Sequence, residues 1–304
     1  MRHKLFLSWV MLLIALSLLS SCSGGGSSDS PQSVPQNGSP LAYEWLMDPT
    51  STGPLVAAHR GAHKDVPENS LAAIRAASVL GADFVEIDVR HTSDGVLVLM
   101  HDSNVSRTTG VSAEIETLTY AQVQQLTLLG SNPSNPETTK VPTFEQALAL
   151  AVETSVMLYV DIKTDRYDLI INAVQAGSYQ KVALLRDYLE TLINIYALDS
   201  SLLLMPPVGS IDELNTAVAA LPTLKIVEYS NDSPNSAFCA AAKALGVKVQ
   251  QDVIANGDII ALMTGSYGGW ENFIDAGVWL LQTDQPDMLV PAVLNYRQTG
   301  ILSP

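Results

Sequence analysis

The spacing of apolar residues changes repeatedly along the chain from Leu55 onward. Short apolar runs, many of them rich in Val and Ile, alternate with stretches in which apolar residues recur every three or four positions, as in amphipathic helices. We expect strands at 55–60, 84–90, 156–162, 181–185, 201–206, 224–229, 247–253 and 278–283. Strands alternating with helices indicate a parallel sheet, and this number of strands is that of an α/β TIM barrel, (β/α)₈.

Helices are expected between these strands, among them 70–80, 144–153, 211–220 and 237–245. Two of them begin at residues that fit a capping box: Thr143 with Gln146, and Ser210 with Glu213. A barrel of this kind occupies about 250 residues. The 304-residue chain is therefore expected to hold one large domain rather than two small ones.

Two features interrupt the regular alternation. An extra short strand at 96–100 follows the turn pair Asp94-Gly95 and predicts a hairpin that continues from the second strand. Residues 103–140 then hold a loop, a helix expected at 120–128 and a second loop rich in Pro and Asn. In barrels, an insertion at the carboxyl end of a strand shapes the substrate site.

The first residues have the features of an export signal. Arg2 and Lys4 precede a mostly apolar run at 5–19, which is short for a membrane span. Residues 19–22, which end in Cys22, resemble a bacterial lipobox, in which the Cys is acylated; the alternative is an ordinary signal peptide cut near Ser21. We expect a signal peptide at 1–21, a lipidated Cys22 with a flexible Ser-, Gly- and Pro-rich tether at 22–50, and the barrel domain at 51–304.

An exported protein with a lipid anchor in the cell envelope follows from this interpretation. Because Ser23 rather than Asp follows the lipid-bearing residue, we expect the outer membrane, on its periplasmic or surface side, unless the host is Gram-positive. Cys239 is then the remaining cysteine, so no disulfide can form within one chain. It lies in an apolar run and is expected to be a buried structural residue.

The charge balance narrows the class of partner. The chain has 16 basic and 31 acidic residues, a formal charge of −15, and loses Arg2 and Lys4 with the signal. A nucleic-acid partner is excluded on this ground, because binding to its phosphates needs a basic surface. An anionic small molecule would also be repelled, so a site for one would need a metal ion, Arg or Lys of its own.

Paired carboxylates occupy the second and third expected strands. Side chains two residues apart in a strand project from one face about 7 Å apart, so Glu86 and Asp88 point the same way. Asp161 and Lys163, also two residues apart, share one face of the third strand in the same way. Inward carboxylates are costly without a cation, and their oxygens are ligands that suit Ca²⁺ or Mg²⁺.

Two histidines end neighbouring expected strands. His59, followed by Arg60, ends the first strand, and His101 ends the hairpin strand. Taken singly, such a His is usually a core residue, an acidic pair a solvated face, and a Lys a surface charge. Their combination at strand ends, where barrel active sites form, favours a catalytic site.

Eight short motifs resemble those of the glycerophosphodiester phosphodiesterase family. They are His59-Arg60-Gly61, Pro67-Glu68-Asn69-Ser70, Glu86-Ile87-Asp88-Val89, His101-Asp102, Arg107-Thr108-Thr109-Gly110, Val141-Pro142-Thr143-Phe144-Glu145, Asp161-Ile162-Lys163 and Thr283-Asp284-Gln285-Pro286. The resemblance covers residues 55 to about 290. It is specific in the first half, whereas residues 170–270 match only in the alternation of elements.

The resemblance implies a TIM barrel with a small insertion after the hairpin, a divalent cation (Ca²⁺ or Mg²⁺), and hydrolysis of glycerophosphodiesters to glycerol 3-phosphate and an alcohol. It makes His59 and His101 the acid/base pair. The implied metal ligands are Glu86, Asp88 and Asp161, the last standing where the family usually has the longer Glu. Arg60 and Lys163 are expected to contact the phosphate oxygens.

Several alternatives remain open at this stage. Glu68 could be a further metal ligand or could orient Arg60. Trp279 and Gln282 could line the pocket, or could be barrel packing and a polar rim. Either water or the glycerol hydroxyl could attack first, the latter giving a cyclic phosphate. The competing functions are a barrel phosphodiesterase of the phospholipase C or D type acting on phospholipid, and a non-catalytic binding lipoprotein. The preferred alcohol and the oligomeric state are not predicted.

Overall fold

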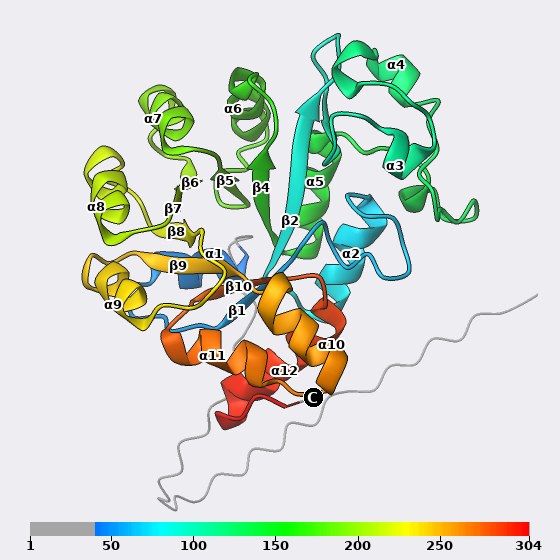
Figure 1. The fold of residues 1–304 in the computed structure, drawn as a ribbon. Coiled ribbons are helices and arrows are strands. Elements are labelled where there is room, and N and C mark those ends of the chain that lie inside the picture. The colour runs from blue at the N-terminus through cyan, green and yellow to red at the C-terminus, as the bar shows by residue number, and fades with distance from the viewer. Residues whose placement is uncertain (1–39, 304) are drawn as a thin grey trace, which may run out of the picture. The chain divides into compact units, whose positions relative to one another are not determined.

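Parallel strands form the centre of residues 40–303, the part of the chain that this computed structural model describes (Figure 1). The expected export signal, Cys22 and most of the expected tether lie outside these residues. The parallel strands are β1 (Leu55–Ala58), β2 (Phe84–His91), β4 (Met157–Ile162), β5 (Ala183–Arg186), β6 (Leu203–Met205), β7 (Pro207–Val208), β8 (Ile226–Tyr229), β9 (Lys248–Asp252) and β10 (Leu280–Thr283). Each of the expected strands is present, with ends shifted by a few residues.

One interrupted strand closes the barrel. The strand order is β6-β5-β4-β2-β1-β10-β9-β8-β7, and β6 and β7 are separated along the chain only by Pro206. β6 pairs with β5, and β7 pairs with β8. Since proline has no N–H to donate to a ladder, the break falls at Pro206-Pro207. Counting β6 and β7 as one strand, the expected TIM barrel is confirmed.

Helices cover the outside of the strands and bury an aliphatic layer against them (Figure 1). They are α2 (Leu71–Leu80), α5 (Phe144–Thr154), α6 (Tyr167–Ala176), α7 (Leu189–Leu198), α8 (Ile211–Ala220), α9 (Ser236–Ala244), α10 (Ile259–Thr264), α11 (Gly268–Ala276) and α12 (Pro286–Thr299). The capping box at Thr143 has both of its hydrogen bonds. At Ser210 only half of the expected box forms, because the Glu213 carboxylate accepts from the Gly209 amide instead.

The amino ends of the strands are closed by apolar packing. Helix α1 (Leu41–Met47) buries Ala42 and Leu46 in the same cluster as the first inward side chains of the strands, such as Leu55 and Phe84. The expected tether at 22–50 therefore extends too far, and the folded domain begins before residue 51. The tether composition that indicated flexibility ends at Pro40, where an amphipathic segment starts.

Trp279 belongs to this closed end of the barrel. Its indole Nε1 donates to Ser51 Oγ at 3.0 Å, and its ring meets Phe84 edge to face with centroids 6.3 Å apart. It precedes β10 at the amino end, opposite the strand ends that carry the histidines. Trp279 therefore lies away from the strand ends that carry the histidines, and of its two interpretations the structure favours barrel packing.

The predicted hairpin and insertion follow β2. Strand β3 (Leu97–Leu99) pairs antiparallel with β2, and the insertion contains α3 (Ser106–Thr109) and α4 (Tyr120–Val123) beyond the carboxyl end of β2 (Figure 1). Its own apolar core includes Leu126 and Leu128. Residues two apart point to different sides of a helix, so a continuous helix could not bury both Leu126 and Leu128 in this core. Helix α4 therefore ends at Val123 rather than at the expected residue 128.

No helix within residues 40–303 is both long and apolar enough to cross a membrane.

Candidate active site

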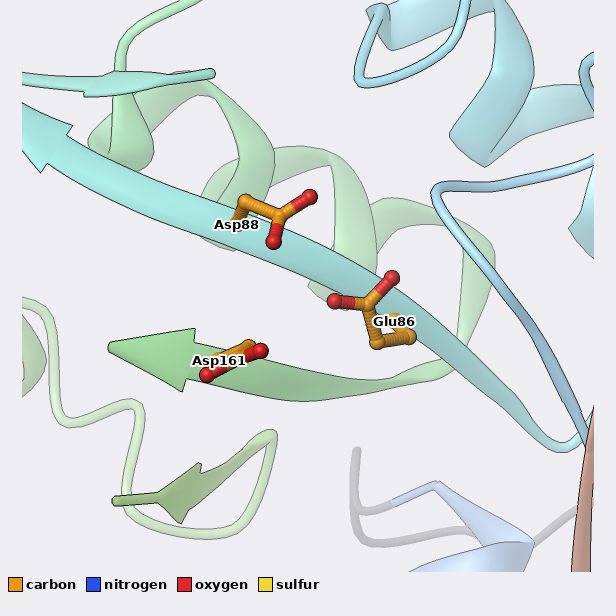
Figure 2. Close-up of side chains that lie close together, drawn as sticks. All are labelled: Glu86, Asp88 and Asp161. Atoms are coloured by element: carbon orange, nitrogen blue, oxygen red, sulfur yellow. The ribbon is translucent and has the colours of Figure 1, made fainter. Parts of the chain in front are cut away.

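Three carboxylates converge from neighbouring strands at the carboxyl end of the barrel (Figure 2). Glu86 and Asp88 come from β2 and Asp161 from β4, with Asp88 and Asp161 paired in register. One oxygen of each lies within 4.8 Å of the others. Burial raises the pKa of Glu86 well above its usual value, and the negative charges of Asp88 and Asp161 add to this effect. A divalent cation would offset this repulsion, so the residues fit such an ion.

Basic side chains adjoin the three carboxylates. Lys163 Nζ lies 2.6 Å from Asp161 Oδ2 and 3.6 Å from Asp88 Oδ1, and Arg60 Nε lies 3.6 Å from Asp88 Oδ2. Burial opposes the charged form of Lys163, but these carboxylates outweigh it and raise the pKa of the Lys163 ammonium. Arg186 Nη1, which the sequence did not single out, lies 3.4 Å from Asp161 Oδ1. If a metal ion held an anion at these carboxylates, the positively charged side chains of Lys163, Arg60 and Arg186 would lie next to that anion.

The loop after β1 is shaped to bring its backbone to Glu86. Arg60 adopts a left-handed φ of 53°, unusual for a residue with a side chain, and its N–H donates to Glu86 Oε2 at 2.7 Å. Gly61 has φ 83°, and a Cβ there would collide with the backbone of Ala73. Asn69 then donates to Asp88 Oδ2 at 2.8 Å and accepts from the Asp88 amide. These bonds fix both carboxylates of β2.

His59 is oriented by a carboxylate from the turn that follows the last strand. Its Nδ1 lies 2.7 Å from Asp284 Oδ1, and its Nε2 lies 4.0 Å from Glu86 Oε2. Burial would raise the pKa of the Asp284 carboxyl, but the two neighbouring histidines outweigh burial and lower this pKa. These are His59 and His63, whose Nε2 lies 3.6 Å from Asp284 Oδ1. An ionised carboxylate only accepts, so Nδ1 carries the proton and Nε2 is left to exchange one with a ligand.

His101 has a second carboxylate partner in its own motif. Its Nδ1 lies 2.7 Å from Asp102 Oδ1, while Asp102 Oδ2 accepts from Arg107 Nε at 2.6 Å. Arg107 lowers the pKa of Asp102 to about 2, with a smaller contribution from His101. The same tautomer argument leaves Nε2 of His101 free for proton transfer.

Glu68 connects Arg107 to Arg60. It accepts from Arg107 Nη1 and Nη2 at 2.7 and 2.8 Å and from Arg60 Nη1 at 3.1 Å. Glu68 is absent from the three-carboxylate group, so the structure favours the interpretation in which it orients Arg60. The insertion thereby reaches both His101 and the loop after β1.

Gln282 lies inside the barrel rather than at its rim. It sits on β10 in register with Asp252 and is 8% exposed. Its Oε1 has no hydrogen-bond partner among the described residues.

The functional pairing of Asp284 and Asp102 with the histidines was missed at the sequence level. Both residues were visible in the Thr283-Asp284 and His101-Asp102 motifs. What linear spacing could not show is that residues 59 and 284 meet, because only barrel closure places β1 beside β10.

One known protein family matches most of the chain. The model of the glycerophosphoryl diester phosphodiesterase family matches residues 59–260. The chain belongs to this family. The match begins at His59 and includes the three carboxylates and both histidines.

Individual relatives are similar over a shorter region. Glycerophosphodiester phosphodiesterase 1 of Mus musculus is 42% identical over 108 residues, covering 35% of this chain and 33% of that protein. A glycerophosphodiester phosphodiesterase of Caldanaerobacter subterraneus is 36% identical over 110 residues, covering 36% and 45%. The chain thus matches between a third and a half of the length of these curated relatives.

Solved structures share the fold over most of the chain. A glycerophosphoryl diester phosphodiesterase of Parabacteroides distasonis has a TM-score of 0.70 at 18% identity, covering 86% of this chain and 91% of that one. A phosphodiesterase of Oleispira antarctica in complex with the product sn-glycerol-3-phosphate has a TM-score of 0.64 at 23% identity, covering 84% and 99%.

Proposed function

We propose that this protein hydrolyses glycerophosphodiesters to glycerol 3-phosphate and an alcohol. The observation that carries the proposal is the pair of histidines, each held through Nδ1 by a carboxylate, at the barrel end that also holds Glu86, Asp88 and Asp161. Membership of the family supports this reaction class. The product in the Oleispira antarctica structure is what such a reaction would release.

The two histidines perform the proton transfers of the proposed reaction. The Nε2 of one imidazole removes the proton of the attacking hydroxyl, and the Nε2 of the other gives a proton to the departing alkoxide. An alcohol is a poor leaving group, so the second transfer is needed for a useful rate, and such catalysis contributes about 10²–10⁴-fold. Arg60 and Lys163 bind the non-bridging phosphate oxygens and hold the phosphorus in line.

Glu86, Asp88 and Asp161 would hold Ca²⁺ or Mg²⁺. When bound, the cation supplies positive charge against the phosphoryl oxygens. Asp161 is one methylene shorter than the Glu that the family usually has, yet its oxygen lies within reach of the other two ligands. Ca²⁺, which tolerates more ligand arrangements than Mg²⁺, is therefore the ion we would test first.

The same proposal includes the membrane anchor. Acylation of Cys22 would fix the protein to the cell envelope, with the outer membrane as the expected site. The lipobox-like residues 19–22 and the Ser-, Gly- and Pro-rich composition that follows support this. Mass spectrometry of the protein purified from membranes would show a diacylglycerol-modified N-terminal Cys22, and a Cys22→Ala variant would lack the modification.

The activity is tested by release of glycerol 3-phosphate from glycerophosphocholine. We expect release that stops with EDTA and returns with Ca²⁺ or Mg²⁺. His59→Gln and His101→Gln are expected to lose it, whereas His91→Gln, whose Nδ1 bonds Thr164 away from the three carboxylates, serves as the matched control. Turnover of phospholipid vesicles with no release from the soluble diester would instead support the phospholipase alternative.

A further inference from the structure

A buried carboxylate, that of Asp258, lies next to the end of β10. Asp258 is 2% exposed. Its Oδ1 accepts from Trp270 Nε1 at 2.8 Å and Thr283 Oγ1 at 2.7 Å, and its Oδ2 accepts from the Asp284 amide at 2.7 Å. Burying a carboxylate is costly unless several donors satisfy it, so the position of Asp258 depends on these three bonds.

The local backbone is specialised to place this carboxylate. Residues Ile254–Asp258 form a π-helical turn after β9, in which the Asp258 amide donates to the Val253 carbonyl five residues back. Such turns occur often at functional sites. A Cβ at Gly257 would collide with the Trp270 ring. The glycine therefore lets the indole come close enough for its Nε1 to reach Asp258.

The bonds from Asp258 converge on the turn that carries the partner of His59. Asp284 holds His59 Nδ1 through its side chain, while Asp258 holds Asp284 through its backbone amide. Thr283 donates its hydroxyl to Asp258, accepts from the Gln285 amide at 2.8 Å, and accepts the His59 amide at its carbonyl. The turn at 283–285 is thus fixed against both Asp258 and His59.

We infer that Asp258 is a positioning residue for the proposed hydrolysis, which acts through the Asp284 amide to hold the Asp284 carboxylate in the orientation that sets the His59 imidazole. The inference rests on the proposed acid/base role of His59. Without the Asp258 acceptor, the Asp284 amide would lose its partner and the turn could rotate. A rotation of the turn would move the carboxylate away from His59 Nδ1 and leave the imidazole free to adopt the other tautomer.

Asp258→Asn is the decisive substitution. An amide side chain of the same shape keeps one acceptor oxygen but presents its NH₂ either to the Asp284 amide or to the Trp270 and Thr283 donors, so at least one of the three bonds is lost. Asp83→Asn is the control, because it makes the same chemical change at the opposite, amino end of the barrel, where the Asp83 carboxylate accepts from the Val56 amide and from Arg297 Nη2. Both variants are assayed at pH 8, above the pKa of Asp258, which burial raises to about 6 against its three hydrogen bonds.

Two measurements separate positioning from general stability. With glycerophosphocholine, Asp258→Asn is expected to lower kcat by about tenfold or more with little change in KM, whereas Asp83→Asn leaves kcat within about twofold at a comparable melting temperature. In ¹⁵N-histidine spectra, assigned with His59→Gln, the hydrogen-bonded Nδ1–H signal of His59 should shift or vanish in Asp258→Asn only.

Contrary outcomes are equally definite. A folded Asp258→Asn variant with wild-type kcat and an unchanged His59 signal would overturn the inference, as would an equal loss of kcat in Asp83→Asn. If Asp258→Asn does not fold, Thr283→Val removes one of the same bonds and is measured in the same way. If wild-type protein shows no turnover, the proposed function fails, but the His59 spectra still decide whether Asp258 positions the imidazole.

Discussion

Replacing Asp102 by Asn would test whether His101 depends on its carboxylate partner. In the folded protein Asp102 accepts from both His101 Nδ1 and Arg107 Nε, at 2.7 and 2.6 Å. Asn offers one acceptor and one NH₂. If its oxygen faces His101, the NH₂ meets the Arg107 donor; if it turns over, His101 must carry its proton on Nε2. Either arrangement removes the geometry or the tautomer that proton transfer needs.

The expected loss is that of one general acid/base step. Such steps contribute about 10²–10⁴-fold, equivalent to about 3–5 kcal/mol of transition-state stabilisation. The assay is kcat for glycerophosphocholine at saturating Ca²⁺ or Mg²⁺, with the melting temperature measured in parallel. Asp168→Asn is the matched control, since Asp168 also pairs with an arginine, Arg166, on the exposed surface of α6. A folded Asp102→Asn variant that keeps most of its kcat would refute the assignment of His101.

Four further predictions follow from the packing and charges. Glu86→Gln should raise the melting temperature in EDTA, because it removes repulsion among buried carboxylates, yet abolish the stabilisation given by added Ca²⁺; a variant that still gained stability from Ca²⁺ would exclude Glu86 as a ligand. In the folded protein the pKa of Asp102 is lowered to about 2. The free energy of unfolding should therefore include the full contribution of ionised Asp102 above about pH 4, and should lose about 1 kcal/mol, after solvent screening, as the pH falls towards 2. In urea titrations, Arg107→Met should lack this loss at acid pH. Gly257→Ala should cost about 1–3 kcal/mol in urea unfolding through overpacking on Trp270, and a neutral effect would contradict the close contact. Leu46→Ala should cost about 2–5 kcal/mol if α1 is part of the folded domain, and no loss would return α1 to the tether.

Local signals accounted for most of the elements. The strand at 84–90 was predicted as one of the short apolar runs rich in Val and Ile, and β2 covers it. The helix expected at 211–220 has those bounds in the structure. The helix expected at 120–128 is present but ends at Val123, because tertiary burial of Leu126 and Leu128 overrides local helix preference. The tether was predicted to continue past Pro40 because α1 is a short helix. It is stabilised by packing against the apolar side chains at the amino ends of the strands, which the local sequence does not show.

The residues of the site also fall into those that local sequence predicts and those that only the tertiary structure brings together. Glu86 and Asp88 were predicted as a pair because two residues of one strand share a face whatever surrounds them. By contrast, the pairing of His59 with Asp284 joins the residues that follow the first and last strands of the barrel, and Trp279 could be placed only once the direction of β10 in the barrel was known.

The sequence by itself determined the fold class, the family and the residue types of the catalytic chemistry, since these depend on period, motif and side-chain identity. The tertiary structure alone decided which carboxylate orients which histidine, that Glu68 serves Arg60 and Arg107, and that Asp258 lies behind Asp284. For His59 and Asp284 the physical reason is barrel closure: a hydrogen bond needs atoms within about 3 Å, and residues more than two hundred positions apart reach that distance only when the first and last strands pair.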